Sequence, residues 1–278
     1  MASQQPWMNH LFTYTGSSSF TEFLSVHAPN LLPTRFEALA ASAGDQIPHA
    51  TTIVAVICDG GVVMAGDRRA TSGNYISQRD IEKVFRADDY SCLGIAGTAS
   101  IGLEVARLFR VELEHYEKTE GRSLSTEGKA HRLATMSRGN LGMAMQGLVV
   151  IPLFAAYDPA TGKGRIFSYD VGGGPYEQYD YHAIGSGSIF ARGSLKKLYR
   201  PGCSVEEAIR VCLNALYDAA DDDAGTGGPD VTRKIWPVVA VITAEGFRRL
   251  PDEETERYVR SMLDARMTEP EGPTAPLR

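Results

Sequence analysis

The sequence is poor in cysteine, and its cysteines have none of the spacings that bind zinc. Only four cysteines occur in 278 residues, without a C-x-x-C pair or a histidine at ligand spacing. This scatter argues against a zinc site and against a disulfide framework. We therefore expect Cys58, Cys92 and Cys212 to act as small apolar side chains of the core.

A long apolar run and an excess of positive charge are also missing. The longest strongly apolar run, residues 148–157, is about half of the roughly 20 residues that a spanning helix needs, so no membrane span is predicted. With 28 Lys and Arg against 34 Asp and Glu, the net charge of -6 predicts no nucleic-acid partner. The first residues lack the basic and apolar regions of a secretory signal, so we expect a cytoplasmic protein.

The chain changes character at Thr51. Residues 1–50 are polar and irregular, with several prolines and a short helix predicted over 33–42, whereas a β-branched run begins at Thr52. The 43% hydrophobic content is enough for a sizeable core. We predict a leader over residues 1–50, one domain over 51–266 and a flexible tail over 267–278.

The pattern within the domain favours an α+β fold. Strands are predicted over 51–58, 62–65, 83–86, 91–96, 149–157, 164–169, 179–184 and 234–243, and helices over 99–118, 126–148, 188–199, 205–221 and 252–266. Consecutive hairpins followed by consecutive helices indicate antiparallel sheets covered by helical layers. Ser204 and Glu207 predict a capping box at the start of one helix.

Two of the predicted helices carry apolar side chains at helical spacing. Both sets are interpreted as core packing. They are Ile101, Val105, Leu108, Phe109 and Leu113 in the first helix, and Leu133, Met136, Leu141, Met145 and Leu148 in the second.

Five separated motifs point to one chemistry. They are TTIVAVICDGGVVMAGDRRAT from Thr51, Lys83, the Gly-x-Ala-Gly-Thr turn at 94–98, Gly-Ser-Gly-Ser at 185–188 and DAGTGGPD at 223–230. In this order they resemble the proteasome β-subunit family, and most closely its bacterial, actinobacterial-type members, in which a propeptide precedes a mature N-terminus TTIVA. The resemblance covers residues 51–266. It implies a four-layer α-β-β-α sandwich of two antiparallel sheets, the N-terminal-nucleophile hydrolase fold, and threonine-type endopeptidase activity.

Thr51 is the nucleophile that this resemblance implies. Cleavage between Ala50 and Thr51 would give Thr51 a free α-amino group beside its own hydroxyl. Such an amine has a pKa of about 7.7 to 8.0, against about 10.4 for lysine, so it is partly a free base near neutral pH. Nucleophile and base would then belong to one residue.

Further site residues follow from the same resemblance. It places Lys83 beside the Thr51 hydroxyl and pairs Asp67 with Lys83; the lysine either favours the alkoxide as a cation or carries the proton. Ser186, Asp223 and Thr226 would hold the Thr51 amine and hydroxyl by hydrogen bonds. The backbone N–H of Gly97 would stabilise the oxyanion. The implied substrate-binding residues are Ala70, Thr71, Ile81, Phe85, Ile95, Ala99 and Leu103.

This uncharged pocket lining favours cleavage after bulky apolar residues.

No metal or cofactor is predicted, because the Asp221-Asp222-Asp223 run lacks the alternating spacing of a calcium loop. The triple glycine at 172–174 has no following lysine to bind phosphate.

One residue departs from the family pattern. The family usually has glycine before the catalytic threonine, and this chain has Ala50. Glycine reaches a positive φ without the penalty of a Cβ atom, so alanine is expected to slow self-cleavage or to be tolerated in an allowed conformation.

The resemblance also implies partners. These are proteasome α subunits and other β subunits in stacked seven-membered rings, an ATP-dependent unfoldase ring acting through the α ring, and unfolded or tagged protein substrates. Three alternatives remain open at this point. The first is the simpler two-ring threonine protease that works with an unfoldase, and the second is a catalytically silent β subunit that only builds the ring. The third, a broader N-terminal-nucleophile amidase, explains fewer of the motifs.

Overall fold

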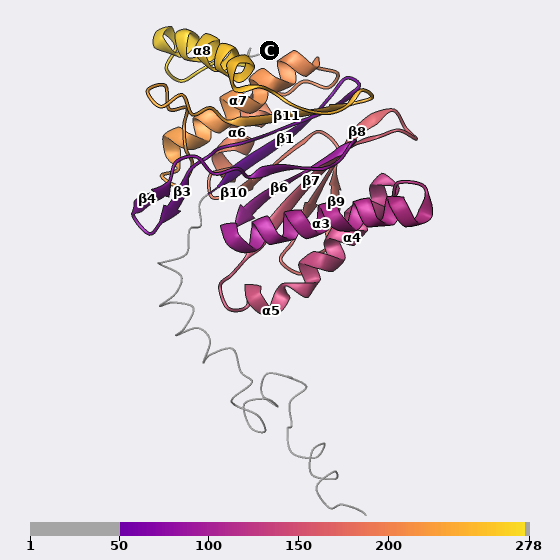
Figure 1. Ribbon diagram of the computed structural model, residues 1–278. Coiled ribbons are helices and arrows are strands. Elements are labelled where there is room, and N and C mark those ends of the chain that lie inside the picture. The colour runs from indigo at the N-terminus through magenta and orange to yellow at the C-terminus, as the bar shows by residue number, and fades with distance from the viewer. Residues whose placement is uncertain (1–50, 276–278) are drawn as a thin grey trace, which may run out of the picture.

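A computed structural model of the chain describes residues 51–275. Two five-stranded sheets lie face to face, and helices cover the outer face of each, so the domain has four layers (Figure 1). This arrangement confirms the predicted α+β sandwich. The leader, with its predicted helix over 33–42 and Ala50, lies outside the described residues.

The first sheet has the strand order β10-β1-β2-β11-β12, and every neighbouring pair is antiparallel. Its strands are β10 (Tyr181–Gly185), β1 (Thr52–Cys58), β2 (Gly61–Gly66), β11 (Val238–Thr243) and β12 (Gly246–Arg249). β1 lies inside the sheet, with partners on both edges. The residue that precedes it, Thr51, is therefore held at a defined end of a central strand.

The second sheet has the order β5-β6-β7-β8-β9 and is also antiparallel. Its strands are β5 (Val84–Asp88), β6 (Ser91–Gly97), β7 (Val150–Asp158), β8 (Lys163–Tyr169) and β9 (Pro175–Gln178). A separate two-stranded ribbon is formed by β3 (Ala70–Ser72) and β4 (Tyr75–Gln78).

The helices divide between the two outer faces. The first sheet is covered by α6 (Ser188–Leu198) and α7 (Val205–Asp222), with α8 (Asp252–Thr268) packed beyond α7; the second is covered by α3 (Ala99–Glu120) and α4 (Thr126–Gly139), as Figure 1 shows. The predicted capping box is present on α7, because the Ser204 N–H donates to Glu207 Oε2 at 2.7 Å and the Glu207 N–H donates to Ser204 Oγ at 3.2 Å.

The alternating side chains of β1 explain why its sequence is apolar throughout. Ile53 and Ala55 lie in the core between the two sheets, whereas Val54, Val56 and Cys58 lie in the core under the helices. Successive residues of a strand point to opposite faces, so a strand covered on both faces needs apolar residues at every position. A third core lies between the second sheet and α3 and α4.

Three predictions about the helices on the second sheet were wrong: the end of α4, the burial of two residues after it, and the burial of Leu108 on α3. The helix predicted over 126–148 ends at Gly139, is capped by Asn140 and is followed only by the short α5 (Leu141–Ala144). As a result, Leu141 and Met145 are 41% and 59% exposed rather than packed in the core. Leu108 is 48% exposed, because the four-residue spacing of Val105 and Phe109 defines the buried stripe and Leu108 lies about 100° around the helix from Phe109.

The strand predicted from residue 234 begins only at Val238. Pro237 precedes it and cannot donate to a strand ladder, and Lys234 has a positive φ of 55°. The short strands β3, β4, β9 and β12 were not predicted. The closing helix continues two residues beyond the predicted end at 266, and in the segment after it Arg266 donates to the carbonyl of Pro270 at 3.3 Å.

All four cysteines are buried and unpaired by disulfides, which confirms the core role predicted for Cys58, Cys92 and Cys212. Burial raises the pKa of the Cys58 thiol to about 12, so this thiol is protonated at neutral pH. In the part of the chain from 51 to 275, no helix is long and apolar enough to cross a membrane.

Candidate active site

Thr51 immediately precedes β1 and lies beside the end of β10. The Ser186 N–H donates to the Thr51 carbonyl at 2.9 Å, and Thr52 pairs with Gly185 of β10. Thr51 is only 5% exposed, yet it lines a pocket at the surface. The nucleophile predicted from the sequence is therefore fixed by backbone pairing and faces a cavity.

Asp67 and Lys83 form a buried ion pair beside this strand. Lys83 Nζ lies 2.8 Å from Asp67 Oδ1, and the two residues are 5% and 1% exposed. Asp67 follows β2 and Lys83 precedes β5, so the pair joins the two sheets at one end of the sandwich. The pairing that the resemblance implied is present in the structure.

Backbone amides complete the surroundings of the Asp67 carboxylate. Its Oδ1 also accepts from the Thr52 N–H at 2.8 Å, and its Oδ2 accepts from the Arg69 and Gly227 N–H groups at 2.9 Å each. A carboxylate can accept about four hydrogen bonds, and Asp67 receives four. The buried negative charge is thus fully satisfied, which holds the carboxylate in one orientation for Lys83.

The Lys83 ammonium has two hydrogen-bond acceptors. Besides Asp67, its ammonium donates to the Arg69 carbonyl at 2.5 Å. Burial lowers the pKa of Lys83 below the ordinary lysine value, and the attraction of Asp67 opposes this shift without cancelling it. The ammonium therefore gives up a proton more readily than a lysine in water, which suits exchange of a proton with a neighbouring hydroxyl.

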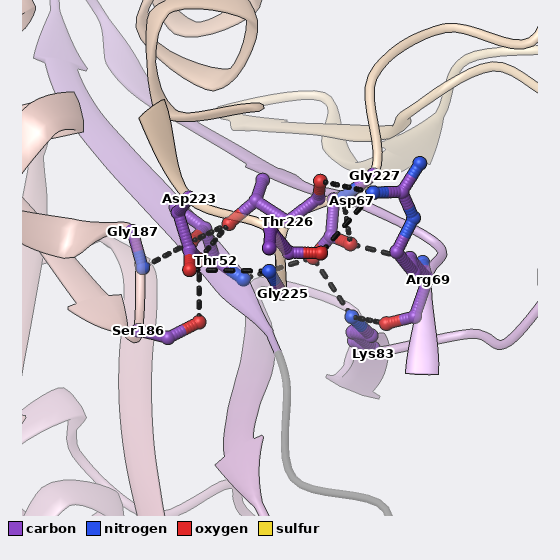
Figure 2. A network of polar contacts seen from close by, with 11 residues as sticks. Thr52, Asp67, Arg69, Lys83, Ser186, Gly187, Asp223, Gly225, Thr226 and Gly227 are labelled. Atoms are coloured by element: carbon purple, nitrogen blue, oxygen red, sulfur yellow. Dashed lines mark hydrogen bonds and ion pairs between the residues drawn. The ribbon is translucent and has the colours of Figure 1, made fainter. Parts of the chain in front are cut away.

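A second polar cluster lies on the other side of Thr52, around Asp223 at the end of α7 (Figure 2). Ser186 Oγ and Thr226 Oγ1 both donate to Asp223 Oδ2 at 2.6 Å. Burial disfavours ionisation of Asp223, but the hydrogen bonds from Ser186 and Thr226 outweigh it, so the pKa of this carboxyl lies below its usual value. The Asp223 carboxyl group in this cluster is therefore ionised at neutral pH.

Gly97 is the last residue of β6, one residue before the Thr98 cap of α3, and it lines the same pocket as Thr51. Its φ is 105°, and a Cβ atom placed there would lie 2.1 Å from the carbonyl oxygen of Val149. Both the left-handed backbone and the close strand contact therefore require glycine. These constraints fix the peptide at the pocket wall, where the resemblance places an oxyanion donor.

The pocket brings together most of the predicted substrate-binding residues. Thr71 is not among the lining residues; it pairs with Ile76 in the β3–β4 ribbon. The predicted residues that do line it are Ala70, Ile81, Phe85, Ile95, Ala99 and Leu103, together with Thr51, Lys83 and Gly97.

Sequence reasoning missed two lining residues, Glu82 and Gly102. The lining is therefore not free of charge as expected, although the Glu82 carboxylate forms an ion pair with Arg249. A Cβ atom on Gly102 would lie 2.6 Å from Ile95 Cγ2, so the missing side chain lets α3 approach the pocket floor. The sequence did offer a signal for Gly102, because a glycine stands beside the apolar stripe of the predicted helix.

Arg69 was also missed, although it stands in the quoted Asp67-Arg68-Arg69 motif. Its guanidinium donates to the carbonyls of Ala224 and Thr226 at 3.2 and 3.1 Å, while its own backbone contacts Asp67 and Lys83. Figure 2 shows it extending from the ion pair toward the Thr226 segment. In the sequence it could not be told from a surface arginine.

Two antiparallel sheets between helical layers, with a threonine that immediately precedes an interior strand and faces a pocket, define the N-terminal-nucleophile hydrolase fold. The sequence pattern of the family described as "Proteasome subunit" matches residues 47–233. The chain therefore belongs to the proteasome subunit family.

Two relatives are similar over nearly their whole length. A "Proteasome subunit beta" of Streptosporangium roseum is 73% identical over 271 residues, covering 98% of this chain and 96% of the relative. A protein of the same description from Acidothermus cellulolyticus is 60% identical over 270 residues, covering 96% of this chain and 93% of the relative. Membership in this family implies assembly with other subunits into a proteasome core.

Proposed function

We propose that this chain is a threonine-type endopeptidase whose nucleophile is Thr51. One observation carries the proposal: the buried Lys83, whose Nζ lies 2.8 Å from Asp67 Oδ1, lines the same pocket as Thr51 and Gly97. A nucleophile, a proton-exchanging group and a backbone donor at one cavity are the parts that acyl transfer needs.

The reaction follows from this arrangement. The Thr51 hydroxyl oxygen bonds to the substrate carbonyl carbon, and its proton passes to the basic group beside it, Lys83 or the Thr51 amine. The Gly97 N–H stabilises the oxyanion. The peptide C–N bond then breaks, the departing amine takes up a proton, and the resulting ester on Thr51 is hydrolysed by water.

The proposal includes removal of residues 1–50 by cleavage after Ala50, because Thr51 gains its amine only then. Mass spectrometry of β subunits from particles assembled with the cognate α subunit should show chains that begin at Thr51. Ala50→Gly should process faster, since glycine adopts strained turn conformations without a Cβ penalty. Active particles whose β chains all retain residues 1–50 would contradict this maturation.

We further propose that cleavage follows bulky apolar residues. The pocket wall is mainly aliphatic and aromatic, and the charge of Glu82 is paired with Arg249. Burying a leucine or phenylalanine side chain contributes about 1.5 to 3 kcal/mol, so such peptides should be cleaved roughly tenfold to a hundredfold faster than acidic or basic ones. The measurement is kcat/KM for fluorogenic peptides that differ only at the residue before the scissile bond. Fastest cleavage after glutamate or arginine would refute the preference.

The assembly that this activity requires has stacked seven-membered rings of β and separate α subunits, fed through the α ring by an ATP-dependent unfoldase. Its substrates are unfolded or tagged proteins, and its location is the cytoplasm. Enclosure of the active sites agrees with a leader that masks Thr51 until the particle is built. Native mass spectrometry of the co-expressed subunits would give the ring stoichiometry.

A further inference from the structure

Thr52, the residue after the proposed nucleophile, connects the two polar clusters of the site. Its side chain is fully buried, although threonine carries a hydroxyl. Its backbone N–H donates to Asp67 Oδ1 at 2.8 Å, and its Oγ1 lies 2.6 Å from Thr226 Oγ1 on the other side (Figure 2). A buried hydroxyl costs free energy unless it is hydrogen-bonded, so this position has a reason to be polar.

The direction of these hydrogen bonds can be assigned from the donors available. The Asp223 carboxylate only accepts, so the single hydroxyl proton of Thr226 is donated to Asp223 Oδ2. The proton between Thr52 and Thr226 must then come from Thr52. Thr52 Oγ1 in turn accepts from the Gly187 N–H at 3.0 Å. An unbroken chain of donors therefore runs from Gly187 through Thr52 and Thr226 to Asp223.

The residues of this hydrogen-bonded series are closely packed around Gly187. A Cβ atom at Gly187 would lie 2.6 Å from Thr52 Oγ1 and 2.6 Å from Thr226 Oγ1. The φ of Gly187 is -83°, which any residue adopts, so glycine is required here by space and not by backbone strain. The Gly-Ser-Gly-Ser turn thus reaches the hydroxyl pair directly.

The same turn also holds Thr51. The Ser186 N–H donates to the Thr51 carbonyl, and Ser186 Oγ donates to Asp223. If the Thr52 hydroxyl were lost, the buried Gly187 N–H would lose its acceptor and Thr226 would lose its donor. The turn and the Asp223 carboxylate would then be held relative to Thr51 only by the two hydrogen bonds of Ser186.

We propose that Thr52 is a positioning residue for the peptidase reaction, whose side-chain hydroxyl orients the Ser186–Asp223–Thr226 cluster toward Thr51. The inference rests on the proposed function. Hydrogen bonds in a chain strengthen one another, so the Thr52 hydroxyl also strengthens the bond from Thr226 that keeps Asp223 ionised. Thr52 does not line the pocket, so it acts on the reaction and not on substrate binding.

The test compares Thr52→Val, which keeps the side-chain shape, with Thr52→Ser, which keeps the hydroxyl, in particles assembled with the α subunit. For Thr52→Val we expect kcat for an apolar fluorogenic peptide to fall at least tenfold with KM within twofold of wild type. The acid limb of its kcat profile should move to higher pH, because Asp223 loses support for its ionised form. Thr52→Ser should stay within threefold of wild type.

Thr255→Val is the matched control, because Thr255 is a buried threonine on α8 outside the site, and it should leave kcat and the pH profile unchanged. Wild-type kcat and pH profile in Thr52→Val, or equal impairment in Thr52→Ser, would overturn the inference. Should Thr52→Val not assemble, Gly187→Ala decides, since its methyl group must displace both hydroxyls and produce the same kcat loss and pH shift. A Gly187→Ala particle that matches wild type in both readouts would overturn the inference.

A parallel assay of Thr51→Ala distinguishes failure of the proposed function from failure of the positioning role of Thr52. Activity retained in Thr51→Ala would refute the proposed function. An inactive Thr51→Ala beside an unaltered Thr52→Val would refute only the positioning role.

Discussion

Replacing Thr51 by alanine should abolish peptide hydrolysis by the assembled particle, with a loss in kcat of at least about 10³-fold. Alanine removes the only group that the proposed reaction uses to attack the substrate carbonyl. The leader should also stay attached, because the same hydroxyl would cleave the bond after Ala50. The measurements are hydrolysis of an apolar fluorogenic peptide and the mass of the β chain.

Two further variants separate chemistry from masking by the leader. A Thr51→Ala chain produced without residues 1–50 should assemble and remain inactive, which shows that an attached leader is not the cause of the loss. Thr51→Ser keeps a hydroxyl and should retain measurable hydrolysis. Wild-type turnover by the leaderless Thr51→Ala particle would refute a threonine nucleophile.

Replacing Lys83 by methionine should lower kcat at least about a hundredfold and destabilise the subunit by about 3 to 5 kcal/mol. Methionine has a similar shape but leaves the Asp67 carboxylate, which is 1% exposed, without its cation. Activity should fall because methionine cannot take up or donate the proton that the proposed reaction exchanges with Thr51. The measurements are kcat of the assembled particle and urea unfolding of the isolated subunit.

The chain offers a matched control for this variant. Lys129 on α4 is also 5% exposed and pairs with Asp88, its Nζ lying 2.6 Å from Asp88 Oδ2, outside the site. Lys129→Met should cost stability of the same order and leave kcat unchanged. In the double variant Asp67→Asn/Lys83→Met the buried charge is gone, so part of the stability should return while activity does not. Near wild-type kcat in Lys83→Met would contradict the role of the lysine.

The sign of one pH effect follows from the same pair. Burial lowers the pKa of Lys83 in the folded state, so between that pKa and its ordinary value the unfolded chain binds more protons than the folded one. Stability contributed by Lys83 therefore rises with pH across this window. The Lys83→Met subunit should lack this rise in alkaline urea titrations, whereas Lys129→Met should keep it.

Local signals in the sequence were enough for the main elements. The continuous apolar run after Thr51 predicted a strand, and the structure shows that both of its faces are buried. Ser204 and Glu207 predicted a helix start that the structure confirms. Such features depend on contacts between residues close in the chain, which a sequence displays directly. Leu108 and Met145 were misplaced because helical spacing alone does not say where a helix ends or which stripe the sheet covers.

By itself, the sequence determined the order of the motifs, the family they resemble and the α+β layering, because periodicity and motif spacing are properties of the chain. It did not determine which side chains meet. Thr52 and Thr226 are 174 positions apart and lie 2.6 Å from each other, and Arg69 reaches the carbonyl of Thr226 across 157 positions. Only the folded sandwich, which places the ends of β1, β2 and α7 together, decided that Thr52 joins the two clusters and that Glu82 enters the pocket wall.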